Sequence, residues 1–143
     1  MENRTVFDTN IWISYFLNEK FSELIELRRE CSVLFLRSIP SLSELKEVIT
    51  RKKFKSKNFN VEKLIEFYNG ITEFCETTPL FKDCPDPKNN FIFDLAIQGK
   101  ASYLVSGDKK VLETRLKSKV LTLTTLTAFK EKLKQEKTHH RLS

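Results

Sequence analysis

Short apolar segments with high β-propensity alternate along this chain with segments whose apolar residues recur at helical spacing. The β-prone segments are residues 5–7, 31–36, 71–77, 103–105 and 120–121. Neighbouring parallel strands require a crossover connection, and a helix between two strands supplies one with the usual right-handed sense. The alternation therefore predicts an α/β fold in the form of a three-layer α/β/α sandwich with a central parallel sheet.

The expected helices lie between and after these strands. They occupy residues 11–17, 21–29, 41–50, 61–70, 91–98 and 111–112, and a last helix begins after residue 124 or 125. Asn60 is the expected N-cap of the helix at 61–70, and Thr124 or Thr125 that of the last helix. Gly99 is expected to end the helix at 91–98.

Ser41 and Glu44 have the spacing of a capping box, in which the glutamate accepts a hydrogen bond from the backbone N–H of the serine. This spacing leaves two interpretations of Glu44 open. It is either a helix cap or a functional carboxylate.

The chain has 143 residues, 40% of them hydrophobic, which fits one domain with a core of ordinary size. Residues 1–123 are expected to form its body, and residues 124–143 a C-terminal helix and basic tail, packed on the domain or frayed from it. The apolar stretches are far shorter than the roughly 20 residues of a membrane-spanning helix. The N-terminus has no apolar signal core. We therefore expect a cytoplasmic protein without a membrane partner, in which Cys31, Cys75 and Cys84 are reduced thiols.

The net charge of +6 indicates attraction to a polyanion, although composition alone is a weak argument. The strongest local concentration of positive charge follows the helix at 41–50. Its basic residues are Arg51, Lys52, Lys53, Lys55 and Lys57, interrupted by Phe54. We interpret this segment as an RNA contact that approaches a single strand and stacks a base on Phe54. The alternative is a solvated charged loop in which Phe54 is buried.

Four acidic residues are expected at the carboxyl edge of the sheet, where ligands of open parallel sheets bind. Asp8 ends the first strand, Asp108 follows the strand at 103–105, and Glu44 and Asp94 lie early in helices. Each has an ordinary structural explanation by itself, as a cap or a turn residue. Together in one cleft they would repel one another unless cations neutralised them. Ligation by oxygen alone suits Mg²⁺ or Mn²⁺, and the chemistry of such sites is phosphodiester hydrolysis.

Four stretches, in order along the chain, resemble the PIN-domain family, and specifically its toxin-like, VapC-type branch found in bacterial and archaeal toxin–antitoxin operons. They are Val6-Phe7-Asp8-Thr9-Asn10, residues 41–49 around Glu44, residues 83–96 through Asp94, and residues 101–108 ending at Asp108. The resemblance extends from about residue 5 to residue 121, and only the C-terminal tail lies outside it.

The resemblance implies a Mg²⁺- or Mn²⁺-dependent endoribonuclease that is the toxin of a type II toxin–antitoxin system, often a homodimer and restrained by an antitoxin. Its catalytic quartet corresponds to Asp8, Glu44, Asp94 and Asp108. Of these, Asp8, Asp94 and Asp108 would hold the metal.

Three polar residues are expected to support this site. Asn10 and Ser106 correspond to residues that order it through hydrogen bonds. Similar proteins often carry an acidic residue at the position of Asn89, which here offers only a neutral oxygen.

Two other functions are weighed against the nuclease. The first is a PIN-like module that binds RNA or a protein with weak or no nuclease activity, which the neutral Asn89 keeps open. The second is a phosphatase that forms a phosphoaspartate, and it is disfavoured because no second Asp stands two positions after Asp8. His139 and His140 have no nearby ligand partners and are assigned no metal.

Overall fold

The computed structural model describes residues 2–51 and 59–142, and within them five parallel strands form one sheet. The strands are β1 (Asn3–Phe7), β2 (Val33–Arg37), β3 (Thr72–Phe74), β4 (Tyr103–Val105) and β5 (Thr122–Thr124), in the order β3-β2-β1-β4-β5. β1 therefore lies at the centre, where the strand order reverses direction. The predicted α/β fold with a central parallel sheet is confirmed.

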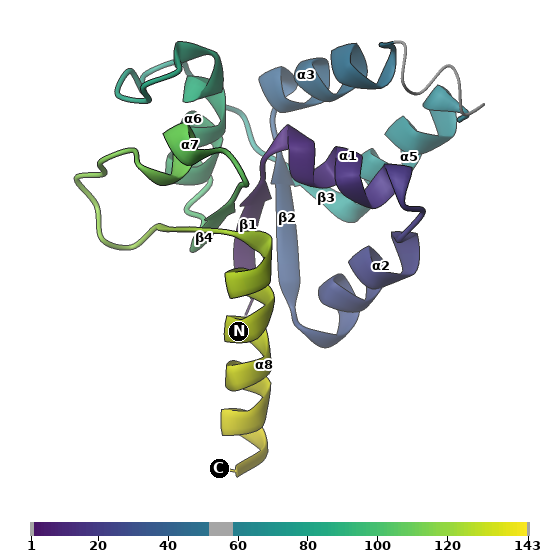
Figure 1. Ribbon diagram of the computed structural model, residues 1–143, viewed down its shortest axis with the longest axis vertical. Coiled ribbons are helices and arrows are strands. Elements are labelled where there is room, and N and C mark those ends of the chain that lie inside the picture. The colour runs from purple at the N-terminus through teal and green to yellow at the C-terminus, as the bar shows by residue number, and fades with distance from the viewer. Residues whose placement is uncertain (1, 52–58, 143) are drawn as a thin grey trace.

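Helices cover both faces of this sheet. They are α1 (Thr9–Leu17), α2 (Phe21–Glu30), α3 (Ile39–Ile49), α5 (Val61–Ile71), the 3₁₀ turn η1 (Pro87–Asn89), α6 (Asn90–Gln98), α7 (Lys109–Leu112) and α8 (Leu126–Leu142). Figure 1 shows α1, α2 and α5 on one side of the strands and α6 and α7 on the other. Among the described residues, no helix is long and apolar enough to cross a membrane.

Two hydrophobic clusters fill the spaces between the layers, because successive strand residues point to opposite faces. In β1, Phe7 belongs to the cluster under α1, α2 and α5, and Val6 to the cluster under α6. The first cluster is aromatic: the ring of Trp12 meets those of Phe35 and Tyr68, each at 5.1 Å between centroids. Burial on both faces explains why the buried parts of β2 and β4 are continuous apolar runs.

α8 packs on the first cluster through Phe129 and Leu133, both buried. The ring of Phe129 meets those of Tyr103 and Phe7 edge-on, at 5.2 and 5.8 Å between centroids. Thr125 caps the helix, since its Oγ1 accepts a hydrogen bond from the backbone N–H of Ala128. Figure 1 shows the C-terminal end of α8 reaching past the amino end of the sheet.

The start of α3 differs from the prediction. The capping box is formed by Ser38 and Ser41, each accepting a hydrogen bond from the other's backbone N–H. Ser41 Oγ also lies 2.9 Å from the hydroxyl of Tyr68 on α5. Glu44 therefore has no part in a capping box, and its interpretation as a helix cap is wrong.

Other boundaries also differ from the predicted ranges. α1 begins at Thr9 and α7 at Lys109, each earlier than predicted. α5 continues to Ile71, β3 ends at Phe74, and β5 lies at Thr122–Thr124 rather than at residues 120–121. Asn60 caps α5 as predicted, with its side chain accepting a hydrogen bond from Lys63 N.

Candidate active site

The adjacent strands β1 and β4 bring Asp8 next to Ser106. Phe7 is paired with Val105, so the residues that follow them leave the sheet side by side. The backbone N–H of Asp8 donates to Val105 O at 2.9 Å, and the Ser106 hydroxyl donates to Asp8 Oδ2 at 2.7 Å. The register of two central strands thus sets this contact between residues 98 positions apart.

Ser106 also holds Asp108. The backbone N–H of Asp108 donates to Ser106 Oγ at 3.0 Å, and Asp108 Oδ1 accepts from Lys110 N at 2.9 Å as the N-cap of α7. The other carboxylate oxygen, Oδ2, accepts from the Asn89 side-chain amide at 3.2 Å. A hydrogen-bonded chain therefore runs Asp8–Ser106–Asp108–Asn89, which we call the Asp8–Asp108 centre.

Asp8 is 5% exposed, and this burial raises the pKa of its carboxyl group above the ordinary value. The Ser106 hydrogen bond opposes the rise, while the negative charge of Asp108 adds to it. Within residues 2–51 and 59–142, no Lys or Arg forms an ion pair with either carboxylate. Two neighbouring carboxylates are thus held together without an ion pair to any basic side chain that the structure describes.

This arrangement fits a hard divalent cation. Mg²⁺ is commonly bound through one or two carboxylates, with water and substrate phosphate oxygens completing its shell. Asp8 and Asp108 supply two such carboxylates, and the adjacent hydroxyl and amide supply the hydrogen bonds that fix their orientation. In the described part of the chain, no group of three or more His, Cys, Asp or Glu residues is placed to hold a metal ion.

Asp94 forms none of the hydrogen bonds of the Asp8–Asp108 centre, and its role as a metal ligand stays a prediction. Its Oδ1 accepts hydrogen bonds from the backbone N–H groups of Leu80 and Phe81, at 3.0 and 2.8 Å, and from Gln98 Nε2 at 3.3 Å. The side chain is buried on α6 and fastens the extended segment that precedes η1. Gln98, one helical turn further on, is a partner that sequence reasoning missed, and its spacing from Asp94 is the signal that would have found it.

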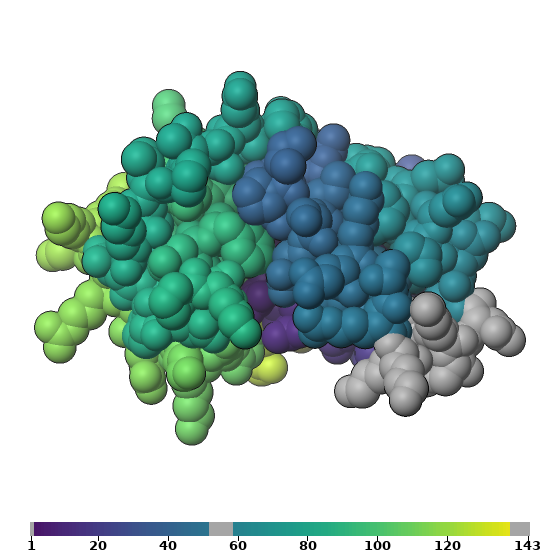
Figure 2. All heavy atoms as spheres, turned by 90° about the horizontal axis from the view of Figure 1, so that it is seen from above, coloured from purple at the N-terminus to yellow at the C-terminus, as the bar shows by residue number. Residues whose placement is uncertain are grey.

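Glu44 lies on α3, half-buried, at the same edge of the sheet as the Asp8–Asp108 centre. Its carboxylate makes no hydrogen bond or ion pair to any residue that the structure describes. Figure 2 looks down on this edge and shows atoms of the N-terminal segment at the bottom of a recess between α3 and α6.

The remaining predicted residues are more peripheral. Asn10 is exposed in the first turn of α1. Arg51 is exposed and pairs with Glu47 at 3.0 Å. The rest of the predicted RNA-binding segment, with Lys52, Lys53, Lys55 and Lys57, lies outside the described residues.

The fold and the acidic centre define a class of protein: a doubly wound parallel sheet with carboxylates at the carboxyl ends of its central strands. A family profile described as "PIN domain" matches residues 4–110, and the chain belongs to this family. PIN domains are generally nucleases and typically use divalent metal ions. No curated protein matches the chain.

One similar solved structure is described as the crystal structure of VapBC2 from Rickettsia felis bound to a DNA fragment from their promoter. The match has a TM-score of 0.56 and 17% sequence identity, and covers 84% of this chain and 96% of that chain. At this level of identity the similarity shows the fold alone.

Proposed function

We propose that this protein is a metal-dependent endoribonuclease whose centre is built on Asp8 and Asp108. The observation that carries the proposal is the buried Asp8 carboxylate, hydrogen-bonded through Ser106 to the loop of Asp108 and paired with no basic residue among those described. A buried charge without a partner costs several kcal/mol in general, so such a pair of carboxylates favours binding of a cation.

Four residues would have distinct roles in the cleavage reaction. Asp8 and Asp108 would hold Mg²⁺ or Mn²⁺, which when bound polarises the phosphate and lowers the pKa of a water. Ser106 keeps both carboxylates in position by donating to one side chain and accepting from the backbone of the other. Glu44, free of other described partners, would accept a proton from the attacking water.

Asparagine substitutions test this proposal because they preserve shape while removing charge. Asp8→Asn and Asp108→Asn should each reduce cleavage of a labelled single-stranded RNA by at least about a hundredfold in Mn²⁺. Asp83→Asn is the matched control, since Asp83 is exposed and hydrogen-bonds to no described residue. Equal cleavage by the wild type and both centre variants would contradict the proposal.

The biological role we propose is the toxin of a type II toxin–antitoxin system, acting in the cytoplasm as a homodimer. It is supported by membership of the PIN family and by the fold shared with a chain from a VapBC2 crystal. The RNA would approach through Arg51 and the basic residues after it. Expression of the chain alone should arrest growth, and the Asp8→Asn variant should not.

A second function, binding of RNA or a protein without cleavage, is favoured by the Asn89 contact. The amide donates to Asp108 Oδ2, and Asp94 Oδ1 accepts from backbone amides, so among the described residues the hydrogen-bonded centre contains two carboxylates, Asp8 and Asp108. Calorimetric titration with Mn²⁺ separates the two functions. Absence of metal binding together with retained RNA binding would favour the second.

A further inference from the structure

An extended segment, residues 75–83, runs along α6 on the side of the sheet opposite α1. Two side chains of α6 hold its backbone: Asp94 accepts from Leu80 N and Phe81 N, and Gln98 both accepts from Thr78 N at 2.9 Å and donates to Thr78 O at 2.7 Å. These side chains bond the segment much as a neighbouring strand would. The segment is thereby fixed in place although no strand pairs with it in the described sheet.

Between this segment and residues 115–121 lies an open groove of about 420 Å³. Its apolar lining includes Leu80 from the segment, Ile97 from α6, and Leu116 and Leu121 from the loop before β5. Leu80 is 67% exposed and Ile97 is 46% exposed, and Val120 of the same loop is 77% exposed. Aliphatic side chains so exposed and so close together are unusual for a surface without a partner.

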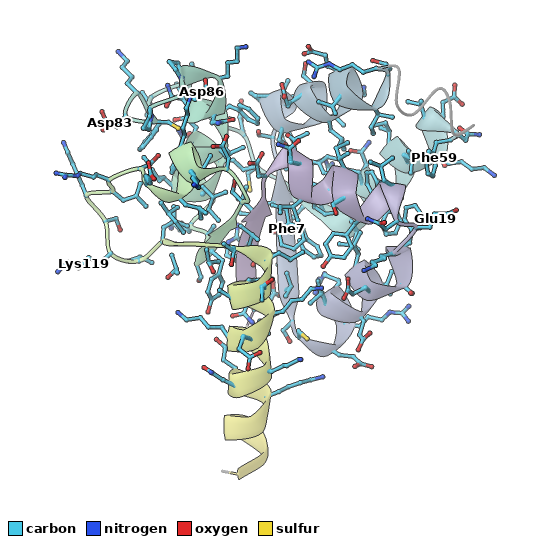
Figure 3. All side chains as sticks on the ribbon, viewed as in Figure 1. Phe7, Glu19, Phe59, Asp83, Asp86 and Lys119 are labelled. Atoms are coloured by element: carbon cyan, nitrogen blue, oxygen red, sulfur yellow. The ribbon has the colours of Figure 1, made fainter. Side chains whose placement is uncertain are left out.

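The charges around the groove are mainly positive. Lys82, Arg115 and Lys117 line it, against a single acidic residue, Asp83. None of the three basic side chains forms an ion pair with another residue of the described part. Figure 3 labels Asp83 and Lys119 on this side of the molecule, beyond α6 and α7. The groove therefore has an apolar floor and an electropositive rim.

An acidic protein segment matches this chemistry better than a nucleic acid. The aromatic ring of the groove, Phe81, is already stacked on Phe93 at 4.5 Å and 13° between ring planes, and the other apolar residues are aliphatic. Recognition of single strands relies on aromatic faces free to stack with bases. A volume of this size accommodates a few aliphatic side chains of a bound peptide.

We propose that this groove is a docking site for an acidic segment of a partner protein that inserts aliphatic side chains between Leu80, Ile97 and Leu121. The rim residues Lys82, Arg115 and Lys117 would pair with its carboxylates and guide its approach. Asp8, Ser106, Asp108 and Asn89 do not line the groove. The docking site is therefore separate from the Asp8–Asp108 centre, and it stands whether or not that centre cleaves RNA.

Selection of short random peptides displayed on phage tests the proposal, with the purified full chain as the target. The enriched peptides should combine Leu or Ile with Asp or Glu. Measured by fluorescence anisotropy, their affinity should fall at least about tenfold in Leu80→Ser and in Ile97→Ser, and also in Lys117→Glu. Ile39→Ser is the matched control, because Ile39 on α3 is as exposed as Leu80, at 67%, and does not line the groove.

The proposal is overturned if selection enriches no acidic–aliphatic peptide, or if such peptides bind wild type and Leu80→Ser equally. It is also overturned if the groove substitutions weaken binding of a labelled oligouridine but not of peptides, because the occupant would then be RNA. Circular dichroism of each variant checks the fold, which substitutions at exposed positions should leave unchanged.

Discussion

Asp94 uses one carboxylate oxygen, Oδ1, to hold the backbone of the segment that precedes η1. It is buried and accepts hydrogen bonds from Leu80 N, Phe81 N and Gln98. Asp94→Ala should remove the charged acceptor of two partly buried N–H groups and lower the free energy of unfolding by about 1–3 kcal/mol. Hydrogen exchange should accelerate at the amides of Leu80 and Phe81.

Asp94→Asn is the informative comparison, because its side-chain oxygen still accepts from the same amides. Exchange at Leu80 and Phe81 should remain close to that of the wild type. If Asp94→Asn and Asp94→Ala both abolished Mn²⁺ binding while exchange at these amides stayed slow, Asp94 would belong to the metal centre after all.

Asn89 limits the charge available to a cation at the Asp8–Asp108 centre. Its amide group donates to Asp108 Oδ2, so it occupies one carboxylate oxygen and adds no negative charge. Asn89→Asp should raise Mn²⁺ affinity by about tenfold or more, measured by calorimetry, because affinity for hard cations grows with ligand charge. Without metal the same variant should melt at a lower temperature, since three carboxylates repel one another.

Lys88→Asp is the control for this substitution. It changes the charge at the preceding position, where the side chain is exposed and lies outside the hydrogen-bonded chain of the Asp8–Asp108 centre. An equal gain in Mn²⁺ affinity from Lys88→Asp would mean that general electrostatics, and not the position of Asn89, controls binding.

The ionised Asp8 carboxylate should make the metal-free protein less stable at neutral pH than at acidic pH, where this group is protonated. Burial, and then the nearby charge of Asp108, raise the pKa of its carboxyl group in the folded state above the ordinary 3.8. Between the unfolded and folded pKa values the folded state binds more protons, so the free energy of unfolding falls as pH rises through that window. This loss of stability is complete once the pH exceeds the pKa of Asp8 in the folded state.

Asp8→Asn removes this cost and should therefore raise the melting temperature by a few degrees at pH 7 in EDTA. The advantage should shrink as the pH is lowered toward 3.8, where the wild-type carboxyl group is protonated. Thermal denaturation of the wild type and of Asp8→Asn between pH 7 and pH 3.8 measures this difference in melting temperature. A variant that is less stable than the wild type at pH 7 would show that the Ser106 hydrogen bond outweighs the burial cost.

At the scale of elements, the end of α6 is packed against β2 at Gly99. A Cβ placed there would lie 2.6 Å from Leu95 O and 2.8 Å from Leu36 Cδ1, and the first of these is backbone that cannot move aside. Gly99→Ala should therefore reduce the free energy of unfolding by about 1–3 kcal/mol in denaturant titrations.

Gly70 provides a control of the same chemical change. It lies within α5, and a Cβ added there would meet nothing within 4 Å. Gly70→Ala should increase stability by about 0.5–1 kcal/mol, because alanine is the better helix former. Equal effects of the two substitutions would mean that the close approach of α6 to β2 is unimportant.

At the scale of the whole molecule, α8 closes the core that the first 124 residues leave open. Phe129 is fully buried and meets Phe7 of β1 and Tyr103 of β4, so the last helix contacts the two central strands. Phe129→Ala should lower the free energy of unfolding by about 3–5 kcal/mol. Glu131→Ala, on the exposed side of α8, should change the free energy of unfolding little.

Much of the architecture was predictable because it depends on local chemistry. The alternation of apolar runs located four of the five strands of the described sheet and placed the fifth just before its true position. The caps at Asn60 and Thr125 are short-range hydrogen bonds with clear sequence signatures. The nearness of Asp8 and Asp108 was also predictable. Asp8 directly follows β1, Asp108 follows β4 after Ser106 and Gly107, and neighbouring parallel strands end at the same edge.

The partners of the other acidic residues depended on tertiary packing. The sequence placed Asp94 and Glu44 in helices near the correct edge, but a position in a helix does not say which neighbour a side chain will meet. Asp94 is fixed by segment 75–83, whose irregular path along α6 has no periodic sequence signal. Glu44 is not part of the capping box because α3 begins at Ile39. The side chains of Ser38 and Ser41 there accept hydrogen bonds from each other's backbone N–H groups.

The sequence by itself thus determined the order of strands and helices and the carboxylates that terminate strands, because hydrophobic periodicity and strand direction are local properties. Only the tertiary structure decided that Asp8 and Asp108 are joined through Ser106 and that Asp94 Oδ1 accepts hydrogen bonds from the backbone of residues 80 and 81. The physical reason is that a buried carboxylate is oriented by whichever hydrogen-bond donors packing brings to it, and those donors come from distant parts of the chain.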